Sequence, residues 1–250
     1  MKFLPLFLLL TLPLLAQPPA TGHLTYTEES LWDPPAGEEN AMPDGIEEAL
    51  RNSGAFLSNY EAVFGEHSFT YTAQPKEPVT IEQDGITIEM LSDGHMTQYY
   101  TDTEAATTRN LLTLGDRPFI VTDDTETLNW QDIDDPSLPT QSEQGFPLRY
   151  AVAVSEEGDT LRAGYTPSLP HRVGPRNYHH AGGAIITLLI RNADGGTMIR
   201  ATGYRPANEG DAVVQSESEG KPVDREQFRR AEKKYRERME RQMRGYQRND

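Results

Sequence analysis

The stretch GPRNYHHAGGAIITLLIRNADGG, from Gly174 to Gly196, decides the fold. Its second half contains seven residues, Ala184 to Ile190, of which only Thr187 is polar. A short apolar run that does not alternate predicts a strand buried on both faces near the centre of a sheet. Pro175 and the pair Gly182-Gly183 precede this run. Both favour a turn that leads into the strand, since glycine allows positive φ and close backbone approach.

The chain around this strand, from Tyr60 to Tyr204, has a β pattern. Short segments rich in Thr, Ile, Val, Tyr and Phe follow one another: HSFTYTA, VTIEQ, ITIEML, MTQYYT, NLLTL, PFIVT, TLNW, LRYAVAV, TLRAGYT, AIITLLI and TMIRATGY. Four turn signals separate such segments: Asp84-Gly85, Asp93-Gly94, Glu157-Gly158-Asp159 and Asp194-Gly195. No helical pattern interrupts the strands, so parallel βαβ units are not expected. We predict a mainly β fold, an antiparallel meander that forms an open barrel or a strongly curved sheet.

Two helices are expected at the ends of this β region. Residues 45–52 (GIEEALRN) predict one or two helical turns with Asp44 as N-cap. Asp224 and Gln227 have the spacing of a capping box at the start of a C-terminal amphipathic helix. One apolar stripe then recurs every three to four residues, through Phe228, Ala231, Tyr235, Met239, Met243 and Tyr246. Because such a stripe gains stability by packing, we favour docking on the β domain over a detached coiled-coil element.

The N-terminus predicts export. Lys2 is followed by the apolar run Phe3 to Leu15 and by Ala16, which is typical of a secretory signal peptide. The mature protein is expected in the periplasm or outside the cell, without a transmembrane segment. The expected division is 1–16 as signal peptide, 17–58 as N-terminal strand plus Pro-rich acidic loop, 59–206 as antiparallel β domain, and 207–250 as linker and charged C-terminal helix.

The composition limits the chemistry and the partners. The 250 residues include no cysteine, which excludes disulfides and thiolate chemistry. The formal net charge is -16, yet the last 30 residues hold 11 Lys and Arg against 6 Asp and Glu. The acidic remainder argues against nucleic acid as a partner. We expect an unidentified ligand or an envelope protein instead.

Four blocks occur in a characteristic order: GHLTYTE, YEAVFGEHSFTYT, RNLLTLGDRPFIVTDDTETLNW and GYTPSLPHRVGPRNYHHAGGAIITLLI. This order resembles the GLPGLI family of secreted Bacteroidota proteins. The naming hexapeptide would lie on His180 to Ile185, where only Gly183 and Ile185 agree with it, and a Cys often found after the Trp block is missing. The resemblance implies an exported β architecture with a charged C-terminal helix. It implies no catalytic residues, because the family has no established reaction.

The histidines before the central strand are the best-placed candidate ligands in the sequence. His179 and His180 are adjacent, so on a strand they would point to opposite faces unless the backbone turns at Gly182-Gly183. His171 would have to fold back across Gly174-Pro175 to join either of them and a carboxylate in a metal site. The alternative is that all three are loop histidines bonded to backbone carbonyls. No fixed metal-ligand spacing such as H-E-x-x-H or C-x-x-C is present, and we expect no cofactor.

Aromatic residues extend this candidate ligand site. Tyr165 and Tyr178 are expected to be exposed, as is one of the adjacent pair Tyr99 and Tyr100. We place Tyr165 and Tyr178 with His179 and His180 as ligand-binding candidates. The catalytic residues, if there are any, are not identified by the sequence.

Three functions fit these features. The first is an exported β-rich binding or envelope-associated module without catalysis. The second is a metal-dependent or other hydrolase that uses the His171, His179 and His180 region. The third is an interaction protein that docks an envelope partner through its C-terminal helix. The sequence contains no G-x-S-x-G and no other activity motif, which favours the first.

Overall fold

The computed structural model describes residues 21–32, 45–83, 86–90, 97–170, 172–192, 195–208 and 214–246. The expected signal peptide and the acidic loop at 33–44 lie outside these residues. The strands are β1 (Gly22–Trp32), β2 (Leu57–Phe64), β3 (Ser68–Ala73), β4 (Val79–Gln83), β5 (Ile86–Met90), β6 (Gln98–Asp102), β7 (Thr107–Leu114), β8 (Arg117–Asp124), β9 (Gln131–Ile133), β10 (Arg149–Val154), β11 (Thr160–Thr166), β12 (Ala184–Asn192), β13 (Gly195–Pro206) and β14 (Lys221–Val223). The helices are α1 (Ile46–Asn52) and α2 (Arg225–Tyr246).

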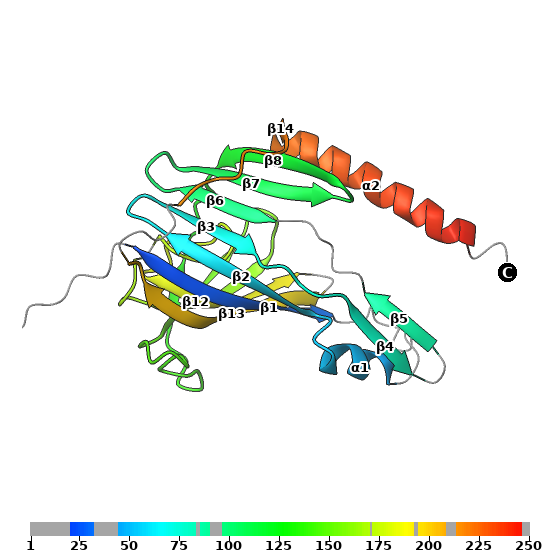
Figure 1. Cartoon of the computed structure of the whole chain (residues 1–250). Helices are drawn as coiled ribbons and strands as arrows, with labels where there is room; N and C mark the ends of the chain where they lie inside the picture. Colours follow the sequence, from blue (N-terminus) through cyan, green and yellow to red (C-terminus); the bar gives the residue numbers. More distant parts are fainter. Residues whose placement is uncertain are drawn as a thin grey trace, which may run out of the picture.

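One large sheet forms the body of the protein. Its order is β14-β8-β7-β6-β3-β2-β1-β13-β12-β11-β10-β9, and every neighbouring pair is antiparallel except β14 with β8. The sheet is not closed; it bends over itself, so that the half with β6, β7 and β8 lies above the half with β1, β13 and β12 (Figure 1). The predicted fold class, a mainly β open barrel or strongly curved sheet with a C-terminal helix, is confirmed. The sheet is joined at its middle by β1, which pairs with β2 on one side and β13 on the other.

The strand predictions are correct for most segments and wrong for one. The segment TLNW forms no strand; β9 begins directly after Trp130. VTIEQ and ITIEM pair only with each other, as the separate hairpin β4-β5. The strands before and after the predicted turn Asp93-Gly94, β5 and β6, belong to different sheets, and the turn itself lies outside the described residues. Local turn signals cannot distinguish these outcomes, because pairing depends on which edge the strand reaches.

The apolar run that begins at Ala184 forms β12, inside the sheet between β11 and β13. Ile185 and Ile186 point to opposite faces and are both buried, as expected for a central strand. The connection before β12, described over residues 167–170 and 172–183, adds Leu169, Val173 and Ala181 to the core. The Tyr26 hydroxyl donates a hydrogen bond of 2.8 Å to the carbonyl of Ile185, which ties β1 to this point.

Both helices have defined N-termini. Gln227 N–H donates to Asp224 Oδ1 at 2.7 Å and the Gln227 side chain accepts from the Asp224 N–H at 3.4 Å, so the predicted capping box is confirmed. The N-cap of α1 is Gly45 with a φ of 81° and no side-chain cap, and not Asp44, which lies outside the described residues. Within the described part of the chain, neither helix is long and apolar enough to cross a membrane.

The start of α2 is held on the sheet edge. β14 pairs in parallel with β8 and ends at Val223, directly before the Asp224 cap, so α2 begins at the edge of the sheet. Phe228 packs edge-on against Phe119 of β8, with ring centroids 5.7 Å apart. Figure 1 shows α2 running alongside β8 and continuing beyond the end of the strands. The docking of the first half of the helix follows from these contacts.

The turn before β12 predicts a sharp size limit at Gly183. A Cβ built there would lie 2.0 Å from the carbonyl oxygen of Thr166, a backbone atom that cannot move aside cheaply. Gly183→Ala should lower the free energy of unfolding by about 3 kcal/mol, as overpacking of a filled interior does. The measurement is urea unfolding followed by circular dichroism.

Gly65→Ala is the matched control, since a Cβ there meets only ordinary contacts at 3.4 Å and beyond. It should change the free energy of unfolding by less than about 1 kcal/mol. Equal midpoints for the two variants would contradict the close approach at Gly183.

Candidate functional site

The two adjacent histidines before β12 differ in exposure: the His179 side chain is buried and the His180 side chain faces solvent. His179 is 6% exposed and packs edge-on against Phe69, with ring centroids 5.8 Å apart. His180 is exposed, and its positive φ of 62° turns the backbone at this point. The two rings still lie near each other, with centroids 4.2 Å apart. Trp130 Nε1–H donates a hydrogen bond to the His179 carbonyl at 2.9 Å, which ties this loop to the segment before β9.

The positions of His179 and His180 do not complete a set of metal ligands among the described residues. Among the described residues, no group of three or more His, Cys, Asp or Glu is placed to hold a metal ion. His171, the third predicted ligand, lies outside the described residues. The metal site therefore stays a prediction that depends on His171.

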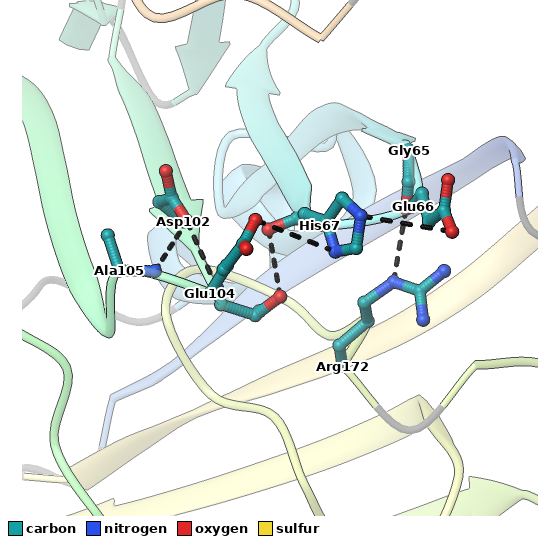
Figure 2. A network of polar contacts seen from close by, with 8 residues as sticks. Gly65, Glu66, His67, Asp102, Glu104, Ala105 and Arg172 are labelled. Atoms are coloured by element: carbon teal, nitrogen blue, oxygen red, sulfur yellow. Dashed lines mark hydrogen bonds and ion pairs between the residues drawn. The ribbon is translucent and has the colours of Figure 1, made fainter.

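His180 instead borders a shallow surface pocket of about 420 Å³ around His67. Figure 2 shows the His67 ring between the carboxylates of Glu66 and Glu104, which lie 3.8 and 3.9 Å from its nitrogens. Arg172 reaches the same region and donates from Nε to the Gly65 carbonyl at 3.0 Å. Both carboxylates are well exposed, so the network is a solvated surface cluster.

The two predicted tyrosines lie at separate places. Tyr165 is 3% exposed, which corrects the expectation that it faces solvent; its hydroxyl donates to Asp132 Oδ1 at 2.9 Å. Its ring covers Gly182, where an added Cβ would lie 2.9 Å from Tyr165 Cε2. Tyr178 is partly buried in the wall of a different cavity, described below. The sequence groups them because both precede the same strand, but in the structure they line two different pockets.

A buried ion pair forms the centre of the most developed site. Arg176 grips Glu28 with two hydrogen bonds, from Nε to Oε1 at 3.1 Å and from Nη2 to Oε2 at 2.9 Å. The Tyr71 hydroxyl donates a third bond to Glu28 Oε1 at 2.9 Å. Glu28 is 6% exposed, so its charge is compensated by these three donors rather than by water. This bidentate geometry fixes the plane of the guanidinium.

Three tyrosines surround the ion pair. Tyr60 stacks on Tyr71 with ring centroids 4.6 Å apart, and Tyr99 lies 6.2 Å from Tyr71. Burial raises the pKa of the Tyr71 hydroxyl far above its usual value, and the Glu28 carboxylate raises it further. Burial likewise raises the pKa of Tyr60 and of Tyr99. These phenols therefore stay protonated: Tyr71 is a neutral donor to Glu28, and the rings of Tyr60 and Tyr99 pack beside it.

Arg176 has an unusual backbone. Its φ of 54° is in the left-handed region, which residues other than glycine rarely adopt. The chain is also closely packed two residues earlier, because a Cβ at Gly174 would lie 1.9 Å from the Tyr178 carbonyl oxygen. Left-handed non-glycine residues persist where their surroundings over-determine them, and they are concentrated at binding and catalytic sites.

The other side of the Arg176 guanidinium borders an open cleft of about 460 Å³, called here the Arg176 cleft. Its walls come from β6, β7, β8, the turn between β10 and β11, residues 176–178 and the first turns of α2. Glu28 occupies Nε and Nη2, and within the described residues Nη1 has no hydrogen-bond partner. The guanidinium of Arg176 therefore borders the cleft in an orientation that Glu28 fixes.

Asn110 supplies an unsatisfied group in the same cleft. It is 6% exposed, and its Oδ1 is buried without a hydrogen-bond partner among the described residues. A buried polar atom without a partner costs about 1 to 3 kcal/mol, so it calls for a reason. A half-turn of the carboxamide exchanges its oxygen and nitrogen, so either can face a molecule in the cleft.

Acidic residues and the helix complete the walls. Asp124, Glu126 and Glu157 border the cleft, and Arg229 of α2 forms an ion pair with Glu157. Arg225 forms a second ion pair, with Asp123 of β8. These two contacts place the start of α2 across one side of the cleft. Asp124 and Glu126 form no ion pair among the described residues, so the cleft contains negative charge as well as the cation of Arg176.

The sequence held one signal for this site and lacked the others. Leu24, Tyr26 and Glu28 alternate along β1, so Glu28 falls on the buried face, which is unusual for a carboxylate. That position predicts a buried partner but does not identify it, since Arg176 is 148 residues away. Asn110 gave no signal, because its neighbours on β7 do not distinguish a cleft wall from a sheet interior.

Comparisons with known proteins bear on the fold alone. No protein-family model and no curated protein matches the chain. The fold is similar to that of the solved structure of PNGF-II in the P21 space group, with a TM-score of 0.51 and 13% sequence identity. The likeness covers 87% of this chain and 34% of PNGF-II, so the chain spans about a third of that protein's length.

The ion pair predicts that replacing Glu28 costs more stability than replacing its neighbour Glu29. Glu28→Leu would leave the Arg176 charge without its buried partner and should lower the free energy of unfolding by about 3 kcal/mol. Glu29→Leu is the matched control: Glu29 is on the other face of β1, where it pairs at 3.5 and 3.3 Å with the exposed Arg51 and Arg200. Its loss should cost less than about 1 kcal/mol.

Urea unfolding of these variants and of the double variant Glu28→Leu/Arg176→Leu measures this difference. The double variant should recover part of the lost stability, because neither charge is then left alone. A double variant that is no more stable than Glu28→Leu alone would contradict the expected recovery.

The tyrosines predict instability in alkali. Burial raises the pKa of Tyr178 to about 12, and Glu126, Asp159 and Glu157 contribute, against the lowering effect of Arg176. The folded state therefore holds a proton that an unfolded tyrosine releases above about pH 10, and stability should fall between about pH 10 and pH 12. Each such group contributes a slope of about 1.4 kcal/mol per pH unit.

Tyr178→Phe removes one of these protons and none of the hydrogen bonds described above, so its stability at pH 7 should be close to that of the wild type. Its stability should fall less steeply between about pH 10 and pH 12. Chemical unfolding at a series of pH values measures both slopes, and identical slopes would contradict a buried Tyr178 hydroxyl.

Proposed function

We propose that this chain is an exported β-rich binding module without catalysis and that the Arg176 cleft is its ligand site; export and the β architecture are what its resemblance to the GLPGLI family implies. One observation carries the proposal: a left-handed Arg176, fixed by a buried carboxylate, presents the guanidinium edge that Glu28 leaves unused to a cleft that also contains Asn110. Both features cost stability in the absence of a ligand. A molecule that binds both would offset that cost.

The groups in the cleft favour a particular ligand chemistry. Arg176 offers donors and so requires an acceptor such as a carboxylate or carbonyl oxygen. The Asn110 oxygen and the carboxylates of Asp124 and Glu126 require a donor such as an ammonium or amide group. A ligand with an acceptor at one end and a donor at the other satisfies both, which describes amino acids and short peptides. The size of the cleft is in the range of small-molecule sites.

The ligand class is tested with simple probes. We expect glycylglycine, asparagine and glutamine to bind the wild-type protein in calorimetric titration. Acetate has only the acceptor and ethylammonium only the donor, so each should bind about tenfold more weakly or worse, the equivalent of one lost hydrogen bond of about 1.4 kcal/mol. Equal binding of acetate would contradict a role for the acidic wall.

Asn110→Leu separates function from stability. Leucine has a similar shape and no polar atom, so the ligand-free variant should be more stable than the wild type by about 1 kcal/mol. The same variant should lose about tenfold or more in affinity for the probes. Thermal unfolding with and without glycylglycine measures both effects in one experiment.

Asn59→Leu is the matched control, since Asn59 is an exposed residue of β2 that does not line the cleft. It should leave probe binding unchanged. The proposal fails if Asn110→Leu binds the probes as well as the wild type, or if none of the probes binds the wild-type protein.

A further inference from the structure

We propose that a second site, further along α2 than the Arg176 cleft, binds an acidic segment of a partner protein. This site is a groove of about 400 Å³ between α2 and the ends of β7 and β8, called here the basic groove. Its lining residues all differ from those of the Arg176 cleft, so the two sites can be tested separately.

The floor of the basic groove is apolar. It is formed by Leu114, Phe119, Ala231 and Tyr235. The Tyr235 ring lies over the turn at Gly115, where a Cβ would be only 3.1 Å from the ring edge. Ala231 and Tyr235 stay partly exposed after the helix has docked, so the groove retains room for an apolar side chain.

The rim of the basic groove is cationic. It is formed by Arg117, Lys234, Arg238 and Arg241, and none of the described carboxylates lines the groove. Within the described residues, none of these four side chains forms an ion pair, whereas Arg225, Arg229, Arg230 and Arg236 of the same helix all do. Arg238 lies over the Tyr235 ring at 5.3 Å, which holds its charge beside the apolar floor.

The charge balance of the chain makes this arrangement selective. The net charge is -16, so carboxylates are in excess, yet none of the described ones neutralises the groove. An unpaired cation cluster attracts anionic partners over a long range and orients them. The acidic body repels the same partners elsewhere, so contact is directed to the groove.

The spacing of the cations favours an extended acidic segment over a single anionic headgroup. The helix positions from Lys234 to Arg241 span about 10 Å along the axis. One phosphate or carboxylate would reach one or two of these cations, whereas a row of acidic side chains reaches them all. The apolar residues form a recessed floor and do not project, so they suit one inserted side chain better than a flat membrane surface.

The probe is a fluorescein-labelled peptide of glutamates interrupted by one leucine, titrated with the full-length mature protein and followed by fluorescence anisotropy. Binding should weaken as salt is added, because the contacts on the rim are exposed. Replacing the leucine of the peptide by serine should weaken binding about tenfold, since one fully buried leucine is worth about that factor or more.

Two adjacent lysines provide the matched variants. Lys234 lines the groove and Lys233 is exposed and does not. Lys234→Gln/Arg238→Gln should weaken peptide binding about fivefold or more, the equivalent of two exposed ion pairs. Lys233→Gln/Arg230→Gln removes the same charge from the same helix and should weaken binding less than about twofold.

The outcomes separate the alternatives. Equal weakening by both double variants would mean a general attraction to the basic helix and would overturn the proposed groove. Absence of peptide binding, together with binding to phosphatidylglycerol vesicles that depends on Lys234, would overturn it in favour of a membrane surface. Circular dichroism of each variant shows whether the helix is retained.

Discussion

The ion pair between Glu28 and Arg176 is the interaction on which the site depends. It joins the first strand of the chain to the connection that precedes β12, across the interior of a bent sheet. Both partners are placed by backbone constraints rather than by local preference. Glu28 is on the inward face of an alternating strand, and Arg176 is held in a left-handed turn. Removing either constraint would leave a charge in an apolar interior, which is the costly alternative that the bidentate geometry prevents.

The same connection links stability to recognition. Residues 167–183 fill the space between the two halves of the sheet with Leu169, Val173 and Ala181, and they also carry Arg176 to the cleft. A segment that packs the core on one side can hold a polar group rigidly on the other. Preorganised groups of this kind lose little entropy when a ligand binds. The three tyrosines around the pair contribute by keeping water away from it.

Helix α2 divides the surface near β8 into two regions of different chemistry. Near its start, the ion pair of Arg229 with Glu157 attaches the helix to the wall of the Arg176 cleft, and that of Arg225 with Asp123 attaches it to β8. Further along the helix, the cations that line the basic groove form no ion pair among the described residues, and no described carboxylate lines the groove with them. The position of the helix is therefore set by its first turns, by the capping box and by β14. The charges further along are left available.

The sequence by itself determined the local elements: the alternating strands, the buried strand AIITLLI, the turn at Gly182-Gly183 and the capping box at Asp224. These follow from side-chain periodicity and backbone freedom, which act over a few residues. Which edge each strand joins, the separate β4-β5 hairpin and the parallel pairing of β14 were decided by tertiary structure. So was the site, because Glu28, Asn110 and Arg176 come from distant parts of the chain. A charge is stable in a protein interior only beside an opposite charge or hydrogen-bond partners, and only the tertiary structure shows which residue provides them.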